Sequence, residues 1–331
     1  MSGTDEVDAS ETSAASGPLP AIPAIDVLCV GETLIDMISL EQADSLAHAT
    51  RFERRLGGSP ANVAAQVARL GGRAAIVSKV GAGAFGSFCR ETLDAAGVLT
   101  DYLVLDPAVH TTVVFVTRTG GTPDFEAFRA GDTQLRPDDL PAGAAQWARA
   151  IHTTVFALCE EPSRSTIRNL LREASGHGAL ISLDPNYHPG IWRDREEALD
   201  TLRTLYPLVD VTKPSLDDAE RLFGAGKTPE AYLDAFHELG ARVALLSMGG
   251  RGVWRSDAAG RVFYPTKPIA ARNATGAGDA FWAGLLLATL DGQSAETQVR
   301  FAQEVARRRL LDEAATVSAA ERQTLYARLA G

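Results

Sequence analysis

The stretch from Asn273 to Leu287 combines small residues, one acid and an apolar run of helical length. Gly276, Ala277 and Gly278 stand where that run begins, so the N–H groups of the first helical turn are expected to face outward and bind an anion. Asp279 follows directly, and its carboxylate would accept a proton from a hydroxyl that attacks a phosphate held by those N–H groups. The alternative is that Asp279 caps the helix and the glycines form a turn.

Two other stretches carry polar groups suited to a small polar ligand. Gly57 and Gly58 precede a predicted helix and would let a ligand approach the backbone closely. The amide of Asn62 either caps that helix or bonds a hydroxyl of the ligand. Asn186 belongs to an Asp-Pro-Asn sequence just past a predicted buried strand, which is where open α/β sheets bind ligands.

Two glycine-rich sequences imitate nucleotide-binding motifs. Residues 81–86 match the GxGxxG pattern, with Asp101 about twenty residues further on, which leaves an NAD-dependent dehydrogenase as one alternative. We discount it because the pattern normally lies on the first strand–helix–strand unit, whereas a complete strand–helix unit precedes it here. Residues 224–228 form a partial phosphate loop in which Arg221 replaces the first glycine, so we expect a helix-ending loop there.

Strands and helices alternate through most of the chain, which predicts an α/β fold with a largely parallel sheet. Residues 1–24 are rich in Ser, Ala, Thr, Gly, Pro and acids, and we expect them to be a disordered tail before one domain at 25–331. Predicted strands at 111–117 and 124–129 form a hairpin that interrupts the alternation. Such a β flap is either a lid that excludes water from a reacting group or a structural or dimer contact.

Composition limits the classes of partner. The formal net charge is -10 and the estimated pI is 5.2, so the surface is expected to repel nucleic acid and anionic membranes. Cys29, Cys89 and Cys159 are odd in number and widely spaced, which favours free thiols in a reducing compartment. No apolar run approaches the roughly 18 residues of a membrane span, and no secretory signal pattern begins the chain. These features favour a cytoplasmic enzyme.

The stretches at 57–62, 184–186 and 275–279, in this order and spacing, resemble the ribokinase-like (PfkB) carbohydrate kinases. The resemblance implies a three-layer αβα fold with a central mostly parallel sheet and a small β lid. It also implies phosphorylation of a sugar hydroxyl with ATP and Mg²⁺. A monovalent cation is a further candidate cofactor, and a homodimer through the lid is a candidate assembly. The resemblance covers residues 26–290, and the lid strands are expected within 34–56 and 109–130.

The same resemblance assigns roles to residues that match the family's motifs, although the residues alone favour a turn for Asp36. Asp279 is the expected catalytic base, and Gly276, Ala277 and Gly278 with the backbone of Asp279 form the expected anion hole. The expected sugar contacts are Asp36, Gly57, Gly58, Asn62, Asn186 and, from the lid, Arg129. The expected ATP contacts are Lys213, Ser247, Gly249, Gly252, Thr275 and Gly278, with Asp218 as an indirect contact to the metal.

The chain departs from the family's pattern at several of these places. His188 stands where Arg is common, and Ser215 to Asp218 replaces an Asn-x-x-Glu motif on the metal side. Asn273 replaces a frequent Asp before the anion hole, and Gly83 replaces an acid. These changes leave the expected base intact but keep a second function class open, a sugar-binding regulator without turnover.

The substrate class is narrowed by a few local sequences. Glu32, the stretch from Phe128 to Asp132 and Trp192 look like those of fructokinases and 2-keto-3-deoxygluconate kinases. Arg129 would pair with the carboxylate of a sugar acid or donate to the hydroxyls of fructose. Because Ala127 and Phe128 replace the tyrosine pair expected in sugar-acid kinases, the sequence favours a fructokinase.

Overall fold

The computed structural model describes residues 25–119, 124–267, 269, 276–311 and 317–329. Within them, a nine-stranded sheet has the order β13-β12-β11-β10-β9-β8-β1-β4-β5. Its neighbours run parallel except at β11–β12 and β12–β13. The strands are β1 (Ile25–Val30), β4 (Ala74–Gly81), β5 (Leu103–Asp106), β8 (Ala148–Thr154), β9 (Leu180–Asp184), β10 (Val211–Thr212), β11 (Val243–Ser247), β12 (Gly252–Asp257) and β13 (Gly260–Pro265).

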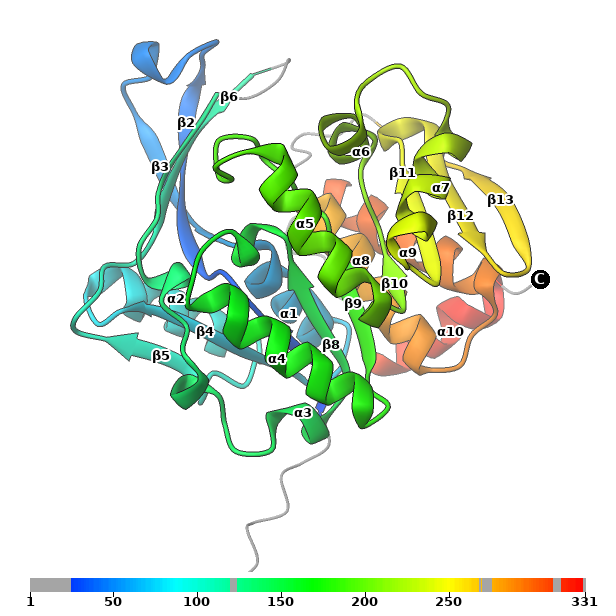
Figure 1. Cartoon of the computed structure of the whole chain (residues 1–331), viewed down its shortest axis with the longest axis horizontal. Coiled ribbons are helices and arrows are strands. Elements are labelled where there is room, and N and C mark those ends of the chain that lie inside the picture. The colour runs from blue at the N-terminus through cyan, green and yellow to red at the C-terminus, as the bar shows by residue number, and fades with distance from the viewer. Residues whose placement is uncertain (1–24, 120–123, 268, 270–275, 312–316, 330–331) are drawn as a thin grey trace, which may run out of the picture.

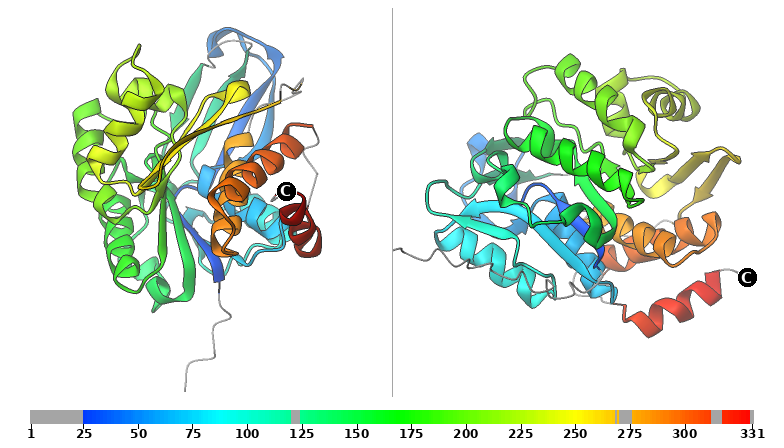
Figure 2. Two further views of the ribbon diagram at one scale, coloured as in Figure 1. Left: turned by 90° about the vertical axis from the view of Figure 1, so that its right-hand side faces the viewer. Right: turned by 60° about the horizontal axis from the view of Figure 1, so that its bottom comes forward.

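Helices cover both faces of this sheet, so its central strands are buried on both sides and read as nearly continuous apolar runs (Figure 2). The helices on one face are α3 (Ala144–Trp147), α4 (Ser163–Gly176), α5 (Arg195–Leu205), α6 (Leu216–Phe223) and α7 (Pro229–Leu239). Those on the other face are α1 (Ser59–Arg69), α2 (Ala84–Ala95), α8 (Ala277–Leu290), α9 (Ala295–Leu311) and α10 (Ala319–Leu329).

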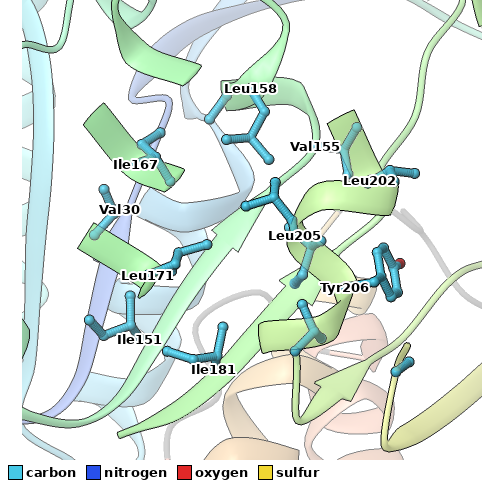
Figure 3. Close-up of a cluster of buried hydrophobic side chains, with 14 of the residues drawn as sticks. Val30, Ile151, Val155, Leu158, Ile167, Leu171, Ile181, Leu202, Leu205 and Tyr206 are labelled. Carbon is cyan, nitrogen blue, oxygen red and sulfur yellow. The ribbon is translucent and has the colours of Figure 1, made fainter. Parts of the chain in front are cut away.

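Each face has its own hydrophobic core. On the first, Ile167 and Leu171 of α4 and Leu202 of α5 pack over Ile151 and Ile181 of the sheet (Figure 3). On the other, α8 is apolar around its whole circumference, as expected for a helix enclosed by neighbouring elements, and it packs against α1 and α9. The sheet and α1 therefore fix where the N-terminus of α8 lies.

A second sheet of four strands projects from one edge of the molecule, at the upper left of Figure 1. Its central pair, β2 and β6, is parallel, and its two outer pairs are antiparallel. The predicted three-layer α/β fold with a small β lid is confirmed. The lid strands, in the order β3-β2-β6-β7, are β2 (Leu34–Gln42), β3 (Phe52–Gly57), β6 (Val113–Arg118) and β7 (Phe125–Phe128).

Other predictions concern short segments. Phe223 ends α6 and Gly224 follows with φ 89°, so residues 224–228 begin a helix-ending loop, as predicted. All three cysteines are free and buried. Among the helices of the described residues, none is long and apolar enough to cross a bilayer.

The GxGxxG sequence connects β4 to α2 in the second strand–helix unit, and its last glycine has a packing role. A Cβ built on Gly86 would lie 1.8 Å from the carbonyl oxygen of Gly81. A Cβ on Gly83, whose φ is -84°, meets nothing within 4 Å. The loop therefore needs glycine at position 86 so that α2 can pack against the end of β4.

This difference predicts unequal effects of two matched substitutions. Gly86→Ala should lower the free energy of unfolding by about 3 kcal/mol or more, because the new methyl group overlaps a backbone oxygen. Gly83→Ala, at the N-cap of α2, should cost about 1 kcal/mol or less. Urea denaturation followed by circular dichroism measures both, and equal midpoints for the two variants would contradict the packing role.

Candidate active site

The N-terminus of α8 borders a cavity, and within the part of the chain that the structure describes its first backbone N–H groups have no backbone acceptor. Gly276 is the N-cap in the left-handed conformation with φ 79°, and its carbonyl accepts from the N–H of Ala280 at 3.0 Å. The N–H groups of Ala277, Gly278 and Asp279 lie in the first turn, where the helix itself supplies no acceptor. Because these residues are small or point aside, the end of α8 is open to an anion.

Asp279 is held by the helix that follows the glycine pair. The hydroxyl of Ser59 donates to Asp279 Oδ1 at 2.7 Å, and the amide of Asn62 donates to Oδ2 at 3.0 Å, across 220 and 217 residues of sequence. Burial raises the pKa of Asp279, while these two bonds and the charges of Lys213 and Arg309 oppose that shift. The carboxylate is thus oriented by α1 and sits inside the protein.

The helix-capping roles considered for Asp279 and for Asn62 are both wrong. Gly276, not Asp279, is the N-cap of α8, and Gly58, not Asn62, is the N-cap of α1. Neither cap makes a side-chain hydrogen bond. The amide of Asn62 instead donates to Asp279, so neither side chain is used to cap a helix.

Asp36 lies inside strand β2, so the turn favoured by the residues alone is also wrong. Its carboxyl group packs against the backbone of Gly57, where a Cβ would lie 2.5 Å from Asp36 Cγ. Burial, and then the charge of Asp279, raise the pKa of Asp36 to about 7. Gly58 has φ 93°, and a Cβ there would lie 2.3 Å from the carbonyl oxygen of Glu32. Gly57 is therefore required by the close approach of Asp36 in strand β2, and Gly58 by the close approach of the Glu32 backbone.

Two cavities meet at the N-terminus of α8. The first, which we call the lid-side cavity, has a volume of about 200 Å³ and includes Asp36, Asn62 and Gly276 in its wall. The second, the sheet-edge cavity, has a volume of about 450 Å³ and includes Ala277 and Gly278. Adjacent residues of one helical turn thus line different cavities. Asp279 is in neither wall, but it directly follows Gly278 of the second and bonds Asn62 of the first.

The sheet-edge cavity gathers most of the predicted nucleotide contacts. Lys213, Ser247, Gly249 and Gly278 all line it, and the remaining wall includes apolar side chains such as Phe281. Gly252 is not part of this wall; it has φ 137°, and a Cβ there would lie 2.3 Å from the carbonyl oxygen of Tyr264. Thr275 and Asn273 lie outside the described residues.

Lys213 connects this cavity to the strand-end Asp-Pro-Asn sequence. Its Nζ is 3.8 Å from Asp184 Oδ2, which also accepts a hydrogen bond from Trp282 Nε1 at 2.7 Å. Burial raises the pKa of Asp184 to about 7, against the opposing charge of Lys213. Asn186 follows with φ 31° and is not part of either cavity wall. Its predicted sugar contact stays a prediction.

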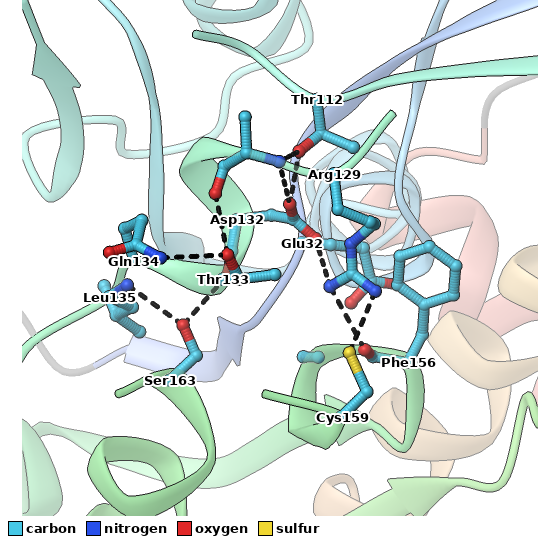
Figure 4. Close-up of polar contacts among 12 residues, drawn as sticks. Glu32, Thr112, Arg129, Asp132, Thr133, Gln134, Leu135, Phe156, Cys159 and Ser163 are labelled. Atoms are coloured by element: carbon cyan, nitrogen blue, oxygen red, sulfur yellow. Dashed lines mark hydrogen bonds and ion pairs between the residues drawn. The ribbon is translucent and has the colours of Figure 1, made fainter. Parts of the chain in front are cut away.

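Arg129 directly follows strand β7 of the lid and is not among the residues that line the lid-side cavity. Figure 4 shows its contacts. Its guanidinium pairs with Asp132, donates to Cys159 Sγ at 3.0 Å and lies over the ring of Phe156 at 4.2 Å. Only 10% of the side chain is exposed. In this structure Arg129 links the end of the lid strand β7 to Asp132, Phe156 and Cys159, and its predicted contact with the sugar stays a prediction.

Asp218 does not fit a direct metal ligand. Its Oδ1 accepts from the N–H of Tyr187 at 3.0 Å, and its Oδ2 accepts from the N–H and the hydroxyl of Ser215 at 2.9 and 2.5 Å. Among the described residues, no group of three His, Cys, Asp or Glu side chains is arranged to hold a metal ion. A divalent ion here would take most of its ligands from a bound phosphate compound and from water.

Sequence reasoning assigned no catalytic or binding role to Glu32. Its side chain holds the residue that follows Gly57 and Gly58. The N–H of Ser59 donates to Glu32 Oε1 at 3.2 Å, and the hydroxyl of Thr154 donates to Oε2 at 2.7 Å. Burial raises the pKa of Glu32 to about 8. The available signal was an acid placed directly after a buried strand, a position that a loop residue can equally occupy.

The raised pKa of Glu32 predicts a pH dependence of stability. Between the ordinary range near 4.5 and about 8, the folded chain keeps a proton that the unfolded chain has released. Stability should therefore fall as pH rises through this window, at a slope approaching about 1.4 kcal/mol per pH unit. Glu32→Gln, which stays neutral, should flatten that slope.

The contrast should be clearest above pH 7, because Asp36 and Asp184, with pKa values of about 7, have mostly ionised there. Chemical denaturation of both proteins at several pH values measures the slope. Identical pH profiles for the wild type and Glu32→Gln would contradict the buried, protonated state of Glu32.

Comparison with known proteins gives a consistent result. A sequence profile described as pfkB family carbohydrate kinase matches residues 24–321. An ATP-dependent 6-phosphofructokinase of Thermoanaerobacterium thermosaccharolyticum is 34% identical over 267 residues, which cover 81% of this chain and 82% of the relative. A fructokinase of Klebsiella pneumoniae is 37% identical over 238 residues, which cover 70% of this chain and 75% of the relative.

Solved structures are similar over nearly the whole fold. The fructokinase of Halothermothrix orenii has a TM-score of 0.75 at 33% identity and covers 88% of this chain and 100% of its own. An uncharacterized sugar kinase from Pyrococcus horikoshii in complex with ATP has a TM-score of 0.80 at 28% identity, covering 92% of this chain and 99% of its own.

Proposed function

The chain belongs to the pfkB family of carbohydrate kinases, and we propose that it transfers the γ-phosphoryl group of ATP to a hydroxyl of a ketose. It is therefore a phosphotransferase that acts on a sugar hydroxyl. The observation that carries the proposal is that Asp279 bonds Asn62, which lines one cavity with Asp36, and directly follows Gly278, which lines the other with Lys213. Relatives named fructokinase at 33 to 37% identity favour fructose over a sugar acid.

Asp279 is the proposed general base. Hydrogen bonds from Ser59 and Asn62 fix its carboxylate, so its orientation does not have to be established during the reaction. Its raised pKa brings it closer to the operating pH, where a base transfers protons most effectively. The acceptor hydroxyl gives its proton to Asp279 as its oxygen bonds phosphorus, and ADP leaves on the other side.

The N-terminus of α8 is the proposed anion hole. Ala277 and Gly278 line the sheet-edge cavity, and the γ-phosphate would lie there against their N–H groups. Their partial positive charge is fixed before the reaction begins, so it stabilises the charge that develops on the transferring group. Gly276, the N-cap of α8, lines the lid-side cavity. A sugar bound in that cavity would therefore lie beside the same end of the helix.

Lys213, Ser247 and Gly249 are the proposed nucleotide contacts, with the apolar wall holding the base. Mg²⁺ bound to the ATP phosphates supplies further neutralisation of charge. Asp218 would reach that ion only through water, because its oxygens already accept hydrogen bonds from Tyr187 and Ser215.

The buried thiols are those of a protein kept in a reducing compartment, and we assign it to the cytoplasm.

Asp279→Asn tests the base directly. It should lower kcat with ATP and the best ketose by about 10²- to 10⁴-fold, since a neutral amide takes up no proton. The KM for ATP should change little, because Asn keeps the size and the contact with Ser59. The control is Asp217→Asn, an exposed acid on α6 outside both cavity walls. Near wild-type turnover by Asp279→Asn would rule out this base, and tight sugar binding without turnover in the wild type would favour the regulator.

We also propose that the lid pairs two copies of the chain. The lid carries Phe52, Phe115 and Phe128, whose rings meet edge to face at 5.2 and 5.9 Å. Phe128 is 57% exposed and Leu40 is 44% exposed. An exposed apolar face on a sheet with free edges is suited to a second copy of the same surface.

Phe128→Asp should therefore convert a dimer into a monomer, because a carboxylate at this exposed position loses its water on pairing. The matched control is Phe85→Asp, since Phe85 on α2 is 40% exposed and lies outside the lid. Sedimentation velocity measures the mass of each protein. A monomeric wild type, or a Phe128→Asp variant that remains dimeric, would contradict pairing through this face.

A further inference from the structure

A buried tryptophan lies in the same helix as the proposed base. Trp282 follows Asp279 by three residues in α8, so the two side chains leave the helix on the same side. Trp282 is completely buried and is not part of either cavity wall. Its indole Nε1–H donates to Asp184 Oδ2 at 2.7 Å. Helix α8 therefore holds a second carboxylate, at the end of strand β9.

The same oxygen of Asp184 lies near the ammonium group of Lys213, whose Nζ is 3.8 Å away. Lys213 Nζ is also 3.8 Å from where a Cβ of Gly278 would be, so it lies beside the first turn of α8. Lys213 lines the sheet-edge cavity, although only 6% of its side chain is exposed. The ammonium is thus next to the backbone N–H groups that are proposed to bind the γ-phosphate.

A lysine side chain does not fix the position of its own charge. Its four-carbon chain is flexible, and its three donors rotate with the ammonium. Asp184 attracts Lys213, but the terminal torsion of an aspartate is itself broad. The indole ring of Trp282 is enclosed by the hydrophobic core on one face of the sheet. A donor held by packing therefore fixes Oδ2 of Asp184, and that oxygen directs Lys213.

The ring of Trp282 also acts on Lys213 directly. Lys213 Nζ lies 5.7 Å from the ring centroid, which is within the range of a cation–π attraction. A further neighbour of the ring is His152, with centroids 4.9 Å apart. Burial, and then the charge of Lys213, lower the pKa of His152 to about 3, so this histidine is neutral. The cation beside Trp282 is therefore that of Lys213.

We infer that Trp282 is a positioning residue for phosphoryl transfer, which holds Asp184 so that Asp184 directs the ammonium of Lys213 at the phosphates of bound ATP. This rests on the proposed function. Trp282 touches no substrate and takes part in no bond change. One helix would then place the proposed base through Asp279 and a proposed phosphate contact through Trp282.

Asp184 gives this arrangement a pH dependence that Trp282 should change. Burial raises the pKa of Asp184 to about 7, and the charges of Asp218 and Asp279 add to that rise. The charge of Lys213 and the hydrogen bond from Trp282 oppose it. Only the carboxylate form attracts the ammonium, so the affinity for ATP should fall as pH falls through about 7. Without the indole N–H the carboxylate loses a donor, and this fall should begin at a higher pH.

The test measures KM for ATP and for the best ketose in the wild type, Trp282→Phe and Trp192→Phe, at pH values on both sides of 7. Trp192 is the control because it is also buried, and its indole nitrogen has no hydrogen-bond partner among the described residues. Above pH 7, Trp282→Phe should raise KM for ATP about 10-fold, as expected for a lost hydrogen bond to a charged group. Its KM for the ketose should change by less than about twofold, and Trp192→Phe should match the wild type.

The pH profiles give an independent readout. The acidic fall in kcat/KM for ATP should move to higher pH in Trp282→Phe and should stay in place in Trp192→Phe. ATP itself titrates identically in every assay, so a difference between the proteins belongs to the protein. Coincident profiles for Trp282→Phe and the wild type would overturn the inference.

A double variant separates an effect through Asp184 from a loss of packing. Asp184→Asn keeps an oxygen that can accept from the indole N–H but removes the charge that attracts Lys213. Adding Trp282→Phe to Asp184→Asn should therefore raise KM for ATP by less than about twofold further, because the tryptophan then has no ion pair to direct. Effects of the two substitutions that multiply would overturn the inference.

Contrary kinetics distinguish the inference from the proposed function. An unchanged KM for ATP in Trp282→Phe overturns the inference but not the kinase activity. An equal change in KM for both substrates overturns it too, because a displaced α8 would then affect Asp279 as well. A wild type that phosphorylates no ketose overturns the proposed function, and the ATP affinities of the same proteins, measured by calorimetry, still decide the inference.

A second measurement needs only the wild type. Nuclear magnetic resonance of protein labelled with nitrogen-15 in tryptophan reports the indole N–H groups separately. The signal of Trp282 should move as Asp184 ionises near pH 7, and it should move again when ATP binds beside Lys213. The signal of Trp192, which has no acceptor among the described residues, is the internal reference. A Trp282 signal that responds to neither pH nor ATP would overturn the inference.

Discussion

The contact between Asp279 and the start of α1 is the interaction on which the arrangement of the site depends. It joins residues more than 200 positions apart, and it forms only if the N-termini of α1 and α8 point at one place. The main sheet makes that possible, because α1 and α8 pack against each other and both contact β1 and β8. Gly57 and Gly58 complete it, since a side chain at either would collide with Asp36 or with the backbone of Glu32.

The arrangement of α1, α8 and the sheet also buries several acids near one another. Burial raises their pKa values and so favours their protonated forms. The pKa values of Glu32, Asp36 and Asp184 rise to about 8, 7 and 7, and that of Asp279 is also raised. Lys213 and the open end of α8 provide the compensating positive charge. An enclosed place with such groups stabilises a transferring phosphoryl more strongly than water would, but it lowers the stability of the fold. We therefore regard the cluster as a cost that the two hydrophobic cores offset.

Sequence patterns predicted the elements well because they report local preferences. An apolar run after small residues defines α8, and buried β-branched runs define β1 and β4 whatever surrounds them. Side-chain direction is a different matter, since it depends on packing between distant elements. Arg129 turns to Asp132 at the hinge, Gly252 serves the pairing of β12 with β13, and Arg69 turns into a cavity from a helix end that looked unremarkable. No spacing rule distinguishes these outcomes.

At His188 and Ser215 the chain departs from the family's pattern, and neither residue contacts Asp279. The ring of His188 packs on Phe125 of the lid, with centroids 4.3 Å apart, so that position joins lid to body by an aromatic contact. Ser215 and Asp218 form a reciprocal capping box that fixes the start of α6. Both residues thus acquire structural partners that do not involve α8. Because neither contact reaches Asp279, these departures leave the hydrogen bonds of the proposed base in place.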